Sequence, residues 1–302
     1  MTPASGLRVS IVVPTLNRCD TLAHVLPTLA AQTFPAGGYE ILLCDAGSTD
    51  GTFDLIEWLA VRNLRVLPCP CLARGPSRNV GIRCARGDLI LFNDADILAD
   101  ADLVARHVRA QGDHPGSAVV GCEVRVGSLD EYEAARADPR GRRTLHPAWR
   151  RRLSWPFFVT GNASVSRETL VRVGMFDERL TAYGHEDLEL GYRLQRHGVR
   201  IRYEPSAVNY HWHPESLDAR LAKMEASGRA TIAVYRMHRD PRILLRMGIN
   251  PVTWGIHALL RGDEAQSAWR RRANSSGFAR RVILETAYLS GAKAAWRDLP
   301  KQ

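Results

Sequence analysis

The sequence predicts an α/β fold in which a mostly parallel sheet is flanked by helices and followed by a helical C-terminal extension. The first observation is that near-continuous apolar runs, typical of strands buried on both faces, alternate with amphipathic segments four times in roughly 90 residues. The second is the composition, because 302 residues with 45% hydrophobic and 24% charged side chains are typical of a globular protein. These figures exclude a disordered chain, a collagen and a small disulfide-stapled scaffold, and the length allows one large or two modest domains.

The predicted elements follow one another in a regular order. Strands are predicted over residues 9–13, 39–44, 64–67 and 88–92, and helices over residues 20–32, 53–62 and 76–85. The Gly-, Pro- and Arg-rich residues 127–156 predict a long irregular loop. Beyond Pro214 the chain is strongly basic, and amphipathic stretches at residues 217–238 and 277–296 predict helices.

Charge and cysteine usage limit the partners and the compartment. The formal net charge is +9, which suits a nucleic acid, an anionic membrane face or an anionic substrate. We expect no nucleic-acid partner, because no interleaving of aromatic and basic residues marks a binding face. The six cysteines form no CxxC pair, no apolar run reaches the roughly 18 residues of a membrane span, and the first residues lack a signal pattern. We therefore expect a cytoplasmic protein, and peripheral contact with the inner membrane face stays open.

Polar clusters follow three of the predicted strands, at residues 14–18, 44–48 and 93–96. In open α/β sheets ligands collect beyond the carboxyl ends of the strands. The glycine-rich phosphate loops GxGxxG and GxxxxGK[ST] are missing, so the phosphates of a nucleotide need another counter-charge. Asp94 and Asp96 offer one, because paired carboxylates bind Mg²⁺ or Mn²⁺ and the metal clamps a diphosphate. The alternative interpretation of this pair is a solvated acidic turn.

Two further groups of residues are candidates for a site. Glu186 and Asp187 stand at the start of a predicted helix, where they are either catalytic carboxylates or a helix cap favoured by the helix dipole. His211 and His213 are two positions apart on an extended segment, so both imidazoles face the same way. They are either metal ligands or ordinary polar surface residues.

Taken together and in order, these residues resemble a family 2 glycosyltransferase of the GT-A fold. The resemblance covers roughly residues 9–214. Its motifs are Pro14-Thr15-x-Asn17-Arg18, Asp45-x-Gly47-Ser48-x-Asp50-Gly51-Thr52, the Arg74–Asn79–Gly81 helix, Asp94-x-Asp96, Gly161-Asn162, Gly174-x-Phe176-Asp177-Glu178 and Gly184-x-Glu186-Asp187. The part from Gly161 to Leu194 looks like the branch in which a Glu-Asp pair lies below the acceptor and a metal-binding His follows about two dozen residues later.

The resemblance implies a Rossmann-like GT-A domain over residues 1–214 and a separate basic helical region over residues 215–302. Residues 1–126 would form the nucleotide-binding half of the GT-A domain, and residues 127–214 the acceptor half. The role of the helical region stays open between packing on the catalytic domain, a homodimer interface and docking on an anionic membrane.

The resemblance also implies roles for individual residues. Pro14 and Thr15 would line the base and ribose, Asp45 would accept a hydrogen bond from the base, Arg74 would approach the ribose or diphosphate, and Asp94 would bind the ribose or donor sugar. The remaining nucleotide-sugar-binding residues would be Asn17, Arg18, Gly47, Asn79, Gly161 and Asn162. Asp96 would ligate Mn²⁺ or Mg²⁺ together with His211 or, alternatively, His213. Asp187 would be the general base, and Glu186 would contact the donor or acceptor sugar.

The implied function is an inverting, metal-dependent glycosyltransferase. It would move a sugar from a nucleotide-diphosphate sugar, with UDP the commonest donor nucleotide for this resemblance, to a hydroxyl of a sugar, lipid-linked or small-molecule acceptor. One carboxylate base and one dication suffice for this chemistry. The alternatives are a sugar nucleotidyltransferase and a catalytically inactive sugar-nucleotide-binding protein. A nucleotidyltransferase would normally carry a glycine-rich, cationic loop after the first strand, where this chain has Pro14-Thr15-Leu16-Asn17-Arg18.

Overall fold

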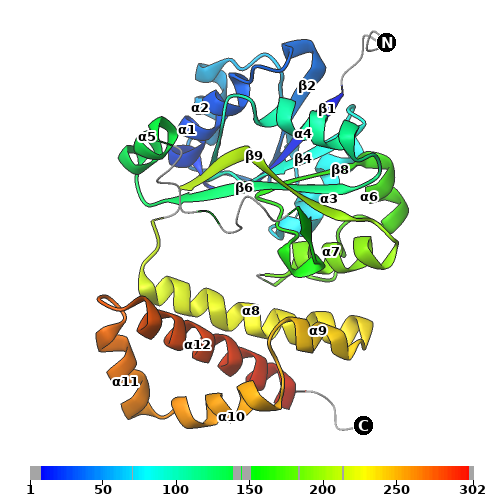
Figure 1. The fold of residues 1–302 in the computed structure, drawn as a ribbon. Helices are drawn as coiled ribbons and strands as arrows, with labels where there is room; N and C mark the ends of the chain where they lie inside the picture. The colour runs from blue at the N-terminus through cyan, green and yellow to red at the C-terminus, as the bar shows by residue number, and fades with distance from the viewer. Residues whose placement is uncertain are drawn as a thin grey trace. The chain divides into compact units, whose positions relative to one another are not determined.

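The computed structural model describes residues 8–69, 71–138, 144, 151–182, 184–212 and 214–298, apart from the side chain of Asp263. The chain divides into two compact units, and Figure 1 shows the ribbon of both. The first comprises Met1–Thr181 and Glu186–Pro214, and the second comprises Ala182–His185 and Glu215–Gln302. The short segment Ala182–His185 thus belongs to the helical second unit, although the chain on both sides of it belongs to the first.

The first unit is built on a sheet that has nine strands among the described residues. Its order is β3-β2-β1-β4-β8-β6-β9-β5, and β7 pairs with β9. The strands are β1 (Val9–Thr15), β2 (Tyr39–Asp45), β3 (Leu64–Pro68), β4 (Leu89–Asn93), β5 (Ile97–Ala99), β6 (Ala118–Val126), β7 (Arg152–Leu153), β8 (Asn162–Ser166) and β9 (Ile201–Trp212). The predicted α/β class is confirmed, and the sheet is mixed: β3-β2-β1-β4 and the β6–β9 pair are parallel, whereas β8, β5 and β7 pair antiparallel with their neighbours.

Helices flank this sheet (Figure 1). They are α1 (Cys19–Ala30), α2 (Thr52–Leu59), α3 (Arg74–Cys84), α4 (Leu103–Asp113), α5 (Leu129–Ala137), α6 (Arg167–Val173) and α7 (Glu186–Arg196). The first helix shows why the sequence folds this way, because its buried residues Leu22, Val25, Leu26 and Leu29 recur at helical spacing and join the core formed by alternate residues of β1. The helices predicted after the first three strands are therefore confirmed.

One prediction between residues 127 and 156 is wrong. The structure has helix α5 in place of an irregular loop at the start of this segment. Ser128 caps the helix by accepting a hydrogen bond from the backbone N–H of Glu131, and the Glu131 carboxylate accepts one from the N–H of Gly127 at 2.7 Å. The Ser-x-x-Glu pattern is a known helix-start signal that the Gly and Pro content concealed.

The second unit is helical. Its helices are α8 (Leu217–His238), α9 (Pro241–Arg246), α10 (Pro251–Leu260), α11 (Asp263–Arg272) and α12 (Gly277–Arg297), so the helices predicted at residues 217–238 and 277–296 are confirmed. The long helices α8 and α12 touch backbone to backbone, because a Cβ at Gly228 would overlap the carbonyl of Tyr288 and a Cβ at Gly291 would overlap that of Glu225. Within the described residues, no helix is both long and apolar enough to cross a bilayer.

Candidate active site at the carboxyl ends of the strands

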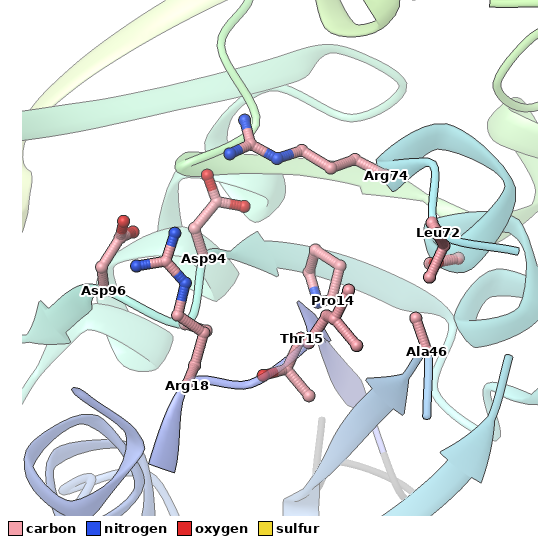
Figure 2. Close-up of a pocket in the computed structure, with 11 residues that line it drawn as sticks. Pro14, Thr15, Arg18, Ala46, Leu72, Arg74, Asp94 and Asp96 are labelled. Atoms are coloured by element: carbon pink, nitrogen blue, oxygen red, sulfur yellow. The ribbon is translucent and has the colours of Figure 1, made fainter. Parts of the chain in front are cut away.

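A pocket opens where β1 and β4 end (Figure 2). These strands are adjacent and parallel, so their carboxyl ends meet at one edge of the sheet. The lining residues are Pro14, Thr15, Leu16, Arg18, Ala46, Leu72, Arg74, Ser77, Asp94, Ala95 and Asp96. The pocket therefore brings together six predicted site residues. They are Pro14, Thr15 and Arg18 at and after the end of β1, Arg74 on α3, and Asp94 and Asp96 after β4.

The pocket carries charges of both signs. Arg18 and Arg74 come from different elements, and Figure 2 shows that both side chains extend toward Asp94 and Asp96. Guanidinium groups bind phosphate oxygens, whereas carboxylates bind divalent cations. The pocket thus offers partners for both an anionic diphosphate and a metal ion.

Thr15 adds a polar group on the floor of the pocket. Its hydroxyl oxygen is buried and has no hydrogen-bond partner among the described residues. A buried hydroxyl without a partner is costly, and the Thr15 residue lines the pocket. The place of Thr15 beside the base or ribose stays a prediction.

Backbone pairing holds Asp96 next to His211. β5 starts one residue after Asp96, and its register places Ile97 opposite His211 on β9. The N–H of Trp212 also donates a 2.9 Å hydrogen bond to the Asp96 carbonyl. As a result, Asp96 Oδ1 lies 3.6 Å from Nε2 of His211.

Glu123 on β6 is a second carboxylate at His211, and it was not predicted from the sequence. Its Oε1 lies 3.3 Å from Nδ1 of the imidazole. Burial by itself lowers the pKa of His211, but hydrogen bonds to Asp96 and Glu123 outweigh burial and raise the pKa to about 10. A metal at this site would compete with that proton. The alternative candidate, His213, lies outside the described residues.

The chemistry of the side chains at Asp96 and His211 fits a divalent cation. Among the described residues, no cluster of three or more His, Cys, Asp or Glu side chains is arranged to hold a metal on its own. Asp96 and His211 supply one oxygen and one nitrogen, a combination that suits Mn²⁺ or Mg²⁺. Such ions are often bound by one or two protein ligands, with substrate phosphates completing the shell.

Arg78 on α3 connects the pocket to the second group of carboxylates. Among the described residues it is the largest fully buried side chain, with 1% of its surface exposed. Its Nη2 donates to Asp94 Oδ1 at 2.6 Å, and its Nη1 donates to Glu186 Oε1 at 3.1 Å. The guanidinium also lies 5.6 Å from the ring centre of Phe176. Arg78 was not predicted from the sequence, because its partner Glu186 lies 108 positions away and no local pattern joins the two.

Asp187 is a carboxylic acid whose pKa is raised. It stands in the first turn of α7 and is half-buried. Burial raises the pKa of Asp187, and repulsion from Glu186 raises it further, while Arg78 partly opposes both, so the pKa is about 7. A general base works best when its pKa lies near the operating pH. The predicted start of a helix at Glu186 is confirmed.

The two residues before this helix have an unusual backbone and belong to the second unit. Gly184 has φ of 102° and His185 has φ of 67°, a left-handed conformation that is uncommon for a residue with a Cβ. His185 Nε2 is hydrogen bonded to Thr231 Oγ1 at 2.9 Å. Thr231 in turn shares a 2.8 Å hydrogen bond with the hydroxyl of Tyr288. Helices α8 and α12 therefore hold the residue that precedes Glu186.

Asp45 and Gly47 lie at a neighbouring hollow, which also involves Phe53 and Cys69. Asp45 is buried at the end of β2, and Oδ2 accepts hydrogen bonds from the N–H groups of Gly47 and Ser48, both at 2.9 Å. Gly47 has φ of 98°, which a glycine adopts without strain. Asp45 thus shapes the turn after β2. A nucleobase that hydrogen bonded to Asp45 would have to share a carboxylate that already accepts these two backbone hydrogen bonds.

Three predicted binding amides are not brought to the pocket. Asn79 exchanges two 2.9 Å hydrogen bonds with the backbone of Phe176. The Asn162 amide donates to Ala207 O at 2.9 Å and lies 2.8 Å from a ring nitrogen of the buried His107. The Asn17 oxygen accepts from the N–H of Thr49, which ties the turn after β1 to the turn after β2. These amides stabilise the elements that carry the pocket.

Gly161 lies beside the pocket aspartate. A Cβ at this position would be 3.9 Å from Asp94 Oδ2, 3.1 Å from Glu123 Oε2 and closer still to Ile97. The missing side chain therefore leaves room for these carboxylates, which is the contribution of Gly161 to the site.

Residues 10–174, more than half of the chain, match the family model described as glycosyl transferase family 2. The chain belongs to glycosyltransferase family 2. Residues 141–215 also match a model described as the N-terminal domain of galactosyltransferase. The family predicted from the sequence motifs is therefore confirmed.

Curated relatives of this family 2 chain include bacterial glycosyltransferases. The uncharacterized glycosyltransferase YfnE of Bacillus subtilis is 27% identical over 272 residues, covering 70% of this chain and 66% of its own length. Validoxylamine A glucosyltransferase of Streptomyces hygroscopicus subsp. jinggangensis is 33% identical over 221 residues, covering 63% and 52%. The chain thus spans about half to two thirds of the length of these relatives.

Solved structures confirm the GT-A fold of this family 2 chain. Mannosyltransferase PcManGT from Pyrobaculum calidifontis, in complex with GDP-Man and Mn²⁺, has a TM-score of 0.69 at 22% identity, over 98% of this chain and 89% of that one. S. aureus TarS 1–349, in complex with UDP, has a TM-score of 0.59 at 16% identity, over 98% and 93%. At such identities the similarity establishes the fold alone.

Proposed function

We propose that this chain is an inverting, metal-dependent glycosyltransferase that moves a sugar from a nucleotide-diphosphate sugar, UDP-linked in the first instance, to an acceptor hydroxyl. The observation that carries the proposal is that the Asp94–Asp96 pocket and the Glu186–Asp187 pair are joined through one buried arginine, Arg78. Family 2 membership supports the reaction class. The solved structures of similar fold that contain GDP-Man or UDP support a nucleotide-sugar donor.

The donor would bind with its diphosphate between Arg18 and Arg74. Guanidinium groups match phosphate oxygens in charge and geometry, and both side chains extend into the pocket. The unpartnered hydroxyl of Thr15 would bond the base or ribose. Asp94, whose carboxylate also accepts a hydrogen bond from Arg78, would bind the ribose or the donor sugar.

Asp96 and His211 would hold Mn²⁺ or Mg²⁺. When bound, the dication neutralises the negative charge that grows on the nucleoside diphosphate as the sugar leaves. The ring nitrogen of His211 that ligates a metal must carry no proton, so a metal bound there would release one of the two protons of the charged imidazole.

Asp187 would remove the proton from the acceptor hydroxyl, whose oxygen attacks the anomeric carbon on the face opposite the leaving diphosphate. The sugar is thereby transferred in one displacement, which inverts the anomeric configuration. Asp187 suits this role because its pKa lies near 7. Glu186 suits it less, because Oε1 already accepts a hydrogen bond from Arg78. Glu186 would instead contact a sugar.

We assign the chain to the branch of the family with a Glu-Asp motif and a metal-binding His. The galactosyltransferase-domain match spans residues 141–215 and so includes Glu186, Asp187 and His211. The acceptor would carry its hydroxyl on a sugar, a lipid-linked precursor or a small molecule.

A nucleotide-sugar panel tests this function. Thermal unfolding is measured with UDP-, GDP- and dTDP-sugars, each with Mn²⁺ and with a chelator, and donor hydrolysis is followed in the same samples. We expect stabilisation and slow hydrolysis with one donor nucleotide, UDP first, and only with the metal. Loss of both effects with every donor would overturn the proposal. Formation of a nucleotide sugar from a nucleoside triphosphate and a sugar phosphate would favour the nucleotidyltransferase alternative.

A further inference from the structure

Helix α10 in the second unit is apolar on two opposite faces. Its inner face carries Trp254, which packs against the core around Ile249 and Tyr288, and His257, which is 3% exposed and hydrogen bonded to Ser290 Oγ at 2.9 Å. A helix that is apolar all round is normally covered all round. The outer face of α10 departs from this rule.

That outer face is exposed. Val252, Ile256 and Leu259 are 70%, 48% and 81% exposed, respectively. Their spacing of four and three residues places them in one stripe along the helix. No Asp, Glu, Lys or Arg occurs between Pro251 and Leu260, so the stripe is not interrupted by charge. Scattered exposed apolar residues are ordinary, but a continuous stripe indicates an interaction surface.

Cations surround this helix in the sequence and dominate the unit. Residues 215–302 contain 16 basic and 8 acidic residues. Arg246 precedes α10 and Arg261 follows it, both exposed and, within the described part of the chain, without a carboxylate partner. Further exposed arginines without a carboxylate partner there are Arg271, Arg272 and Arg281 on α11 and α12.

We propose that the outer face of α10 docks on the surface of an anionic lipid bilayer. Val252, Ile256 and Leu259 enter the boundary between headgroups and acyl chains, and the flanking arginines bind lipid phosphates. An apolar helix face with basic flanks lies in the plane of such an interface, because burial of the stripe and attraction to anionic headgroups act together. A second copy of the chain would bring a region with the same positive charge against this one, so charge complementarity favours the lipid.

The experiment is vesicle co-sedimentation of the full chain. Vesicles of phosphatidylglycerol and phosphatidylcholine are compared with vesicles of phosphatidylcholine alone, at low and at high ionic strength. We expect binding to the anionic vesicles at low salt, weaker binding at high salt and little binding to the neutral vesicles. Sedimentation equilibrium without vesicles measures the oligomeric state in the same buffers.

Two sets of variants identify the surface. The triple variant Val252→Ser, Ile256→Ser and Leu259→Ser should lose at least about tenfold in vesicle affinity, because the apolar stripe is removed. Val171→Ser is the matched control, since Val171 on α6 is 53% exposed but belongs to the first unit. Arg246→Gln with Arg261→Gln should weaken binding mainly at low salt. Thermal unfolding of each variant checks that the helical unit is intact.

Several results would overturn the proposal. Wild-type protein that stays in the supernatant with anionic vesicles at low salt excludes a lipid surface. A folded triple-serine variant that binds as tightly as wild type shows that α10 is not the docking face. A wild-type dimer that becomes monomeric in the triple-serine variant assigns the stripe to a second copy of the chain.

Discussion

The guanidinium of Arg78 donates a 2.6 Å hydrogen bond to the carboxylate of Asp94. The same guanidinium donates a hydrogen bond to Glu186 at 3.1 Å, although the two acids are far apart in sequence. Asp94 lines the pocket, whereas Glu186 begins the helix that carries Asp187. One buried cation therefore fixes the separation between the proposed donor site and the proposed base.

Replacing Arg78 should weaken the fold. Arg78→Met keeps most of the volume but leaves the buried carboxylate of Glu186 without its cation, so we expect a loss of roughly 3–5 kcal/mol in the free energy of unfolding. Arg78→Lys keeps a charge but loses the two-pronged geometry, so its loss should be intermediate. Urea denaturation measures both values. A methionine variant as stable as wild type would show that Arg78 does not hold these elements together.

Asp96→Ala should abolish metal-dependent nucleotide binding. The change removes the carboxylate that lies 3.6 Å from His211, and with it one of the two proposed protein ligands. Calorimetric titration of UDP in the presence of Mn²⁺ measures the effect. Glu133→Gln, at an exposed acid on α5, is the control for loss of one negative charge. Unchanged affinity in the Asp96 variant would remove this residue from the metal site.

Asp187→Asn should bind the donor normally but transfer sugar about 10²–10⁴-fold more slowly, which is the usual contribution of a positioned acid–base group. Asparagine keeps the shape of the side chain but cannot take up the proton of the acceptor hydroxyl. Transfer rates and donor affinity are measured on the same preparations. If transfer falls less than about tenfold while Glu186→Gln is inactive, Glu186 is the base instead.

The pH dependence of transfer should follow the ionisation of Asp187. Its pKa is raised to about 7, so the carboxylate that can accept a proton is depleted below this pH. We expect kcat/KM to fall by about tenfold per pH unit below pH 7 and to level off above it. The metal concentration is kept saturating, because protonation of His211 weakens metal binding in the same direction. A profile that is flat from pH 5.5 to 8 would contradict the assignment.

Gly228→Ala should destabilise the helical unit, although alanine is the better helix former. A Cβ at Gly228 on α8 would overlap the Tyr288 carbonyl of α12, so the two helices would have to separate. Gly255→Ala on α10 is the matched control, since nothing lies within 4 Å of its Cβ position and the change should stabilise by about 0.5–1 kcal/mol. Chemical denaturation compares the two. Equal effects of the two substitutions would show that α8 and α12 are not in backbone contact.

The first half of the fold could be predicted because its strands are buried on both faces. β1 and β2 are buried along almost their whole length, so they are near-continuous apolar runs in the sequence. β8 could not be recognised in this way, because Asn162 and Ser164 face a buried polar network around His107. The apolar periodicity that predicts a strand is absent where a strand contributes hydrogen bonds to the core.

The candidate site was predictable to the extent that its residues follow strand ends. Asp94 and Asp96 directly follow β4, and Thr15 ends β1, so a local pattern places them at one edge of the sheet. Arg78 and Glu123 could not be found, because their partners come from other elements that only the tertiary structure brings near. Asn79 and Asn162 were expected to bind ligand because they stand in motifs, but their amides cross-link the backbone.

The hydrogen bond between His185 and Thr231 constrains how this chain can be divided or recombined. A chimaera joined at Pro214 would receive a foreign helix opposite His185, even though His185 itself lies 29 residues before the junction. The foreign residue at the position of Thr231 would then have to be one that hydrogen bonds with the retained His185. The boundary between the units is therefore discontinuous in sequence, so cutting the gene at a single codon does not yield two interchangeable modules.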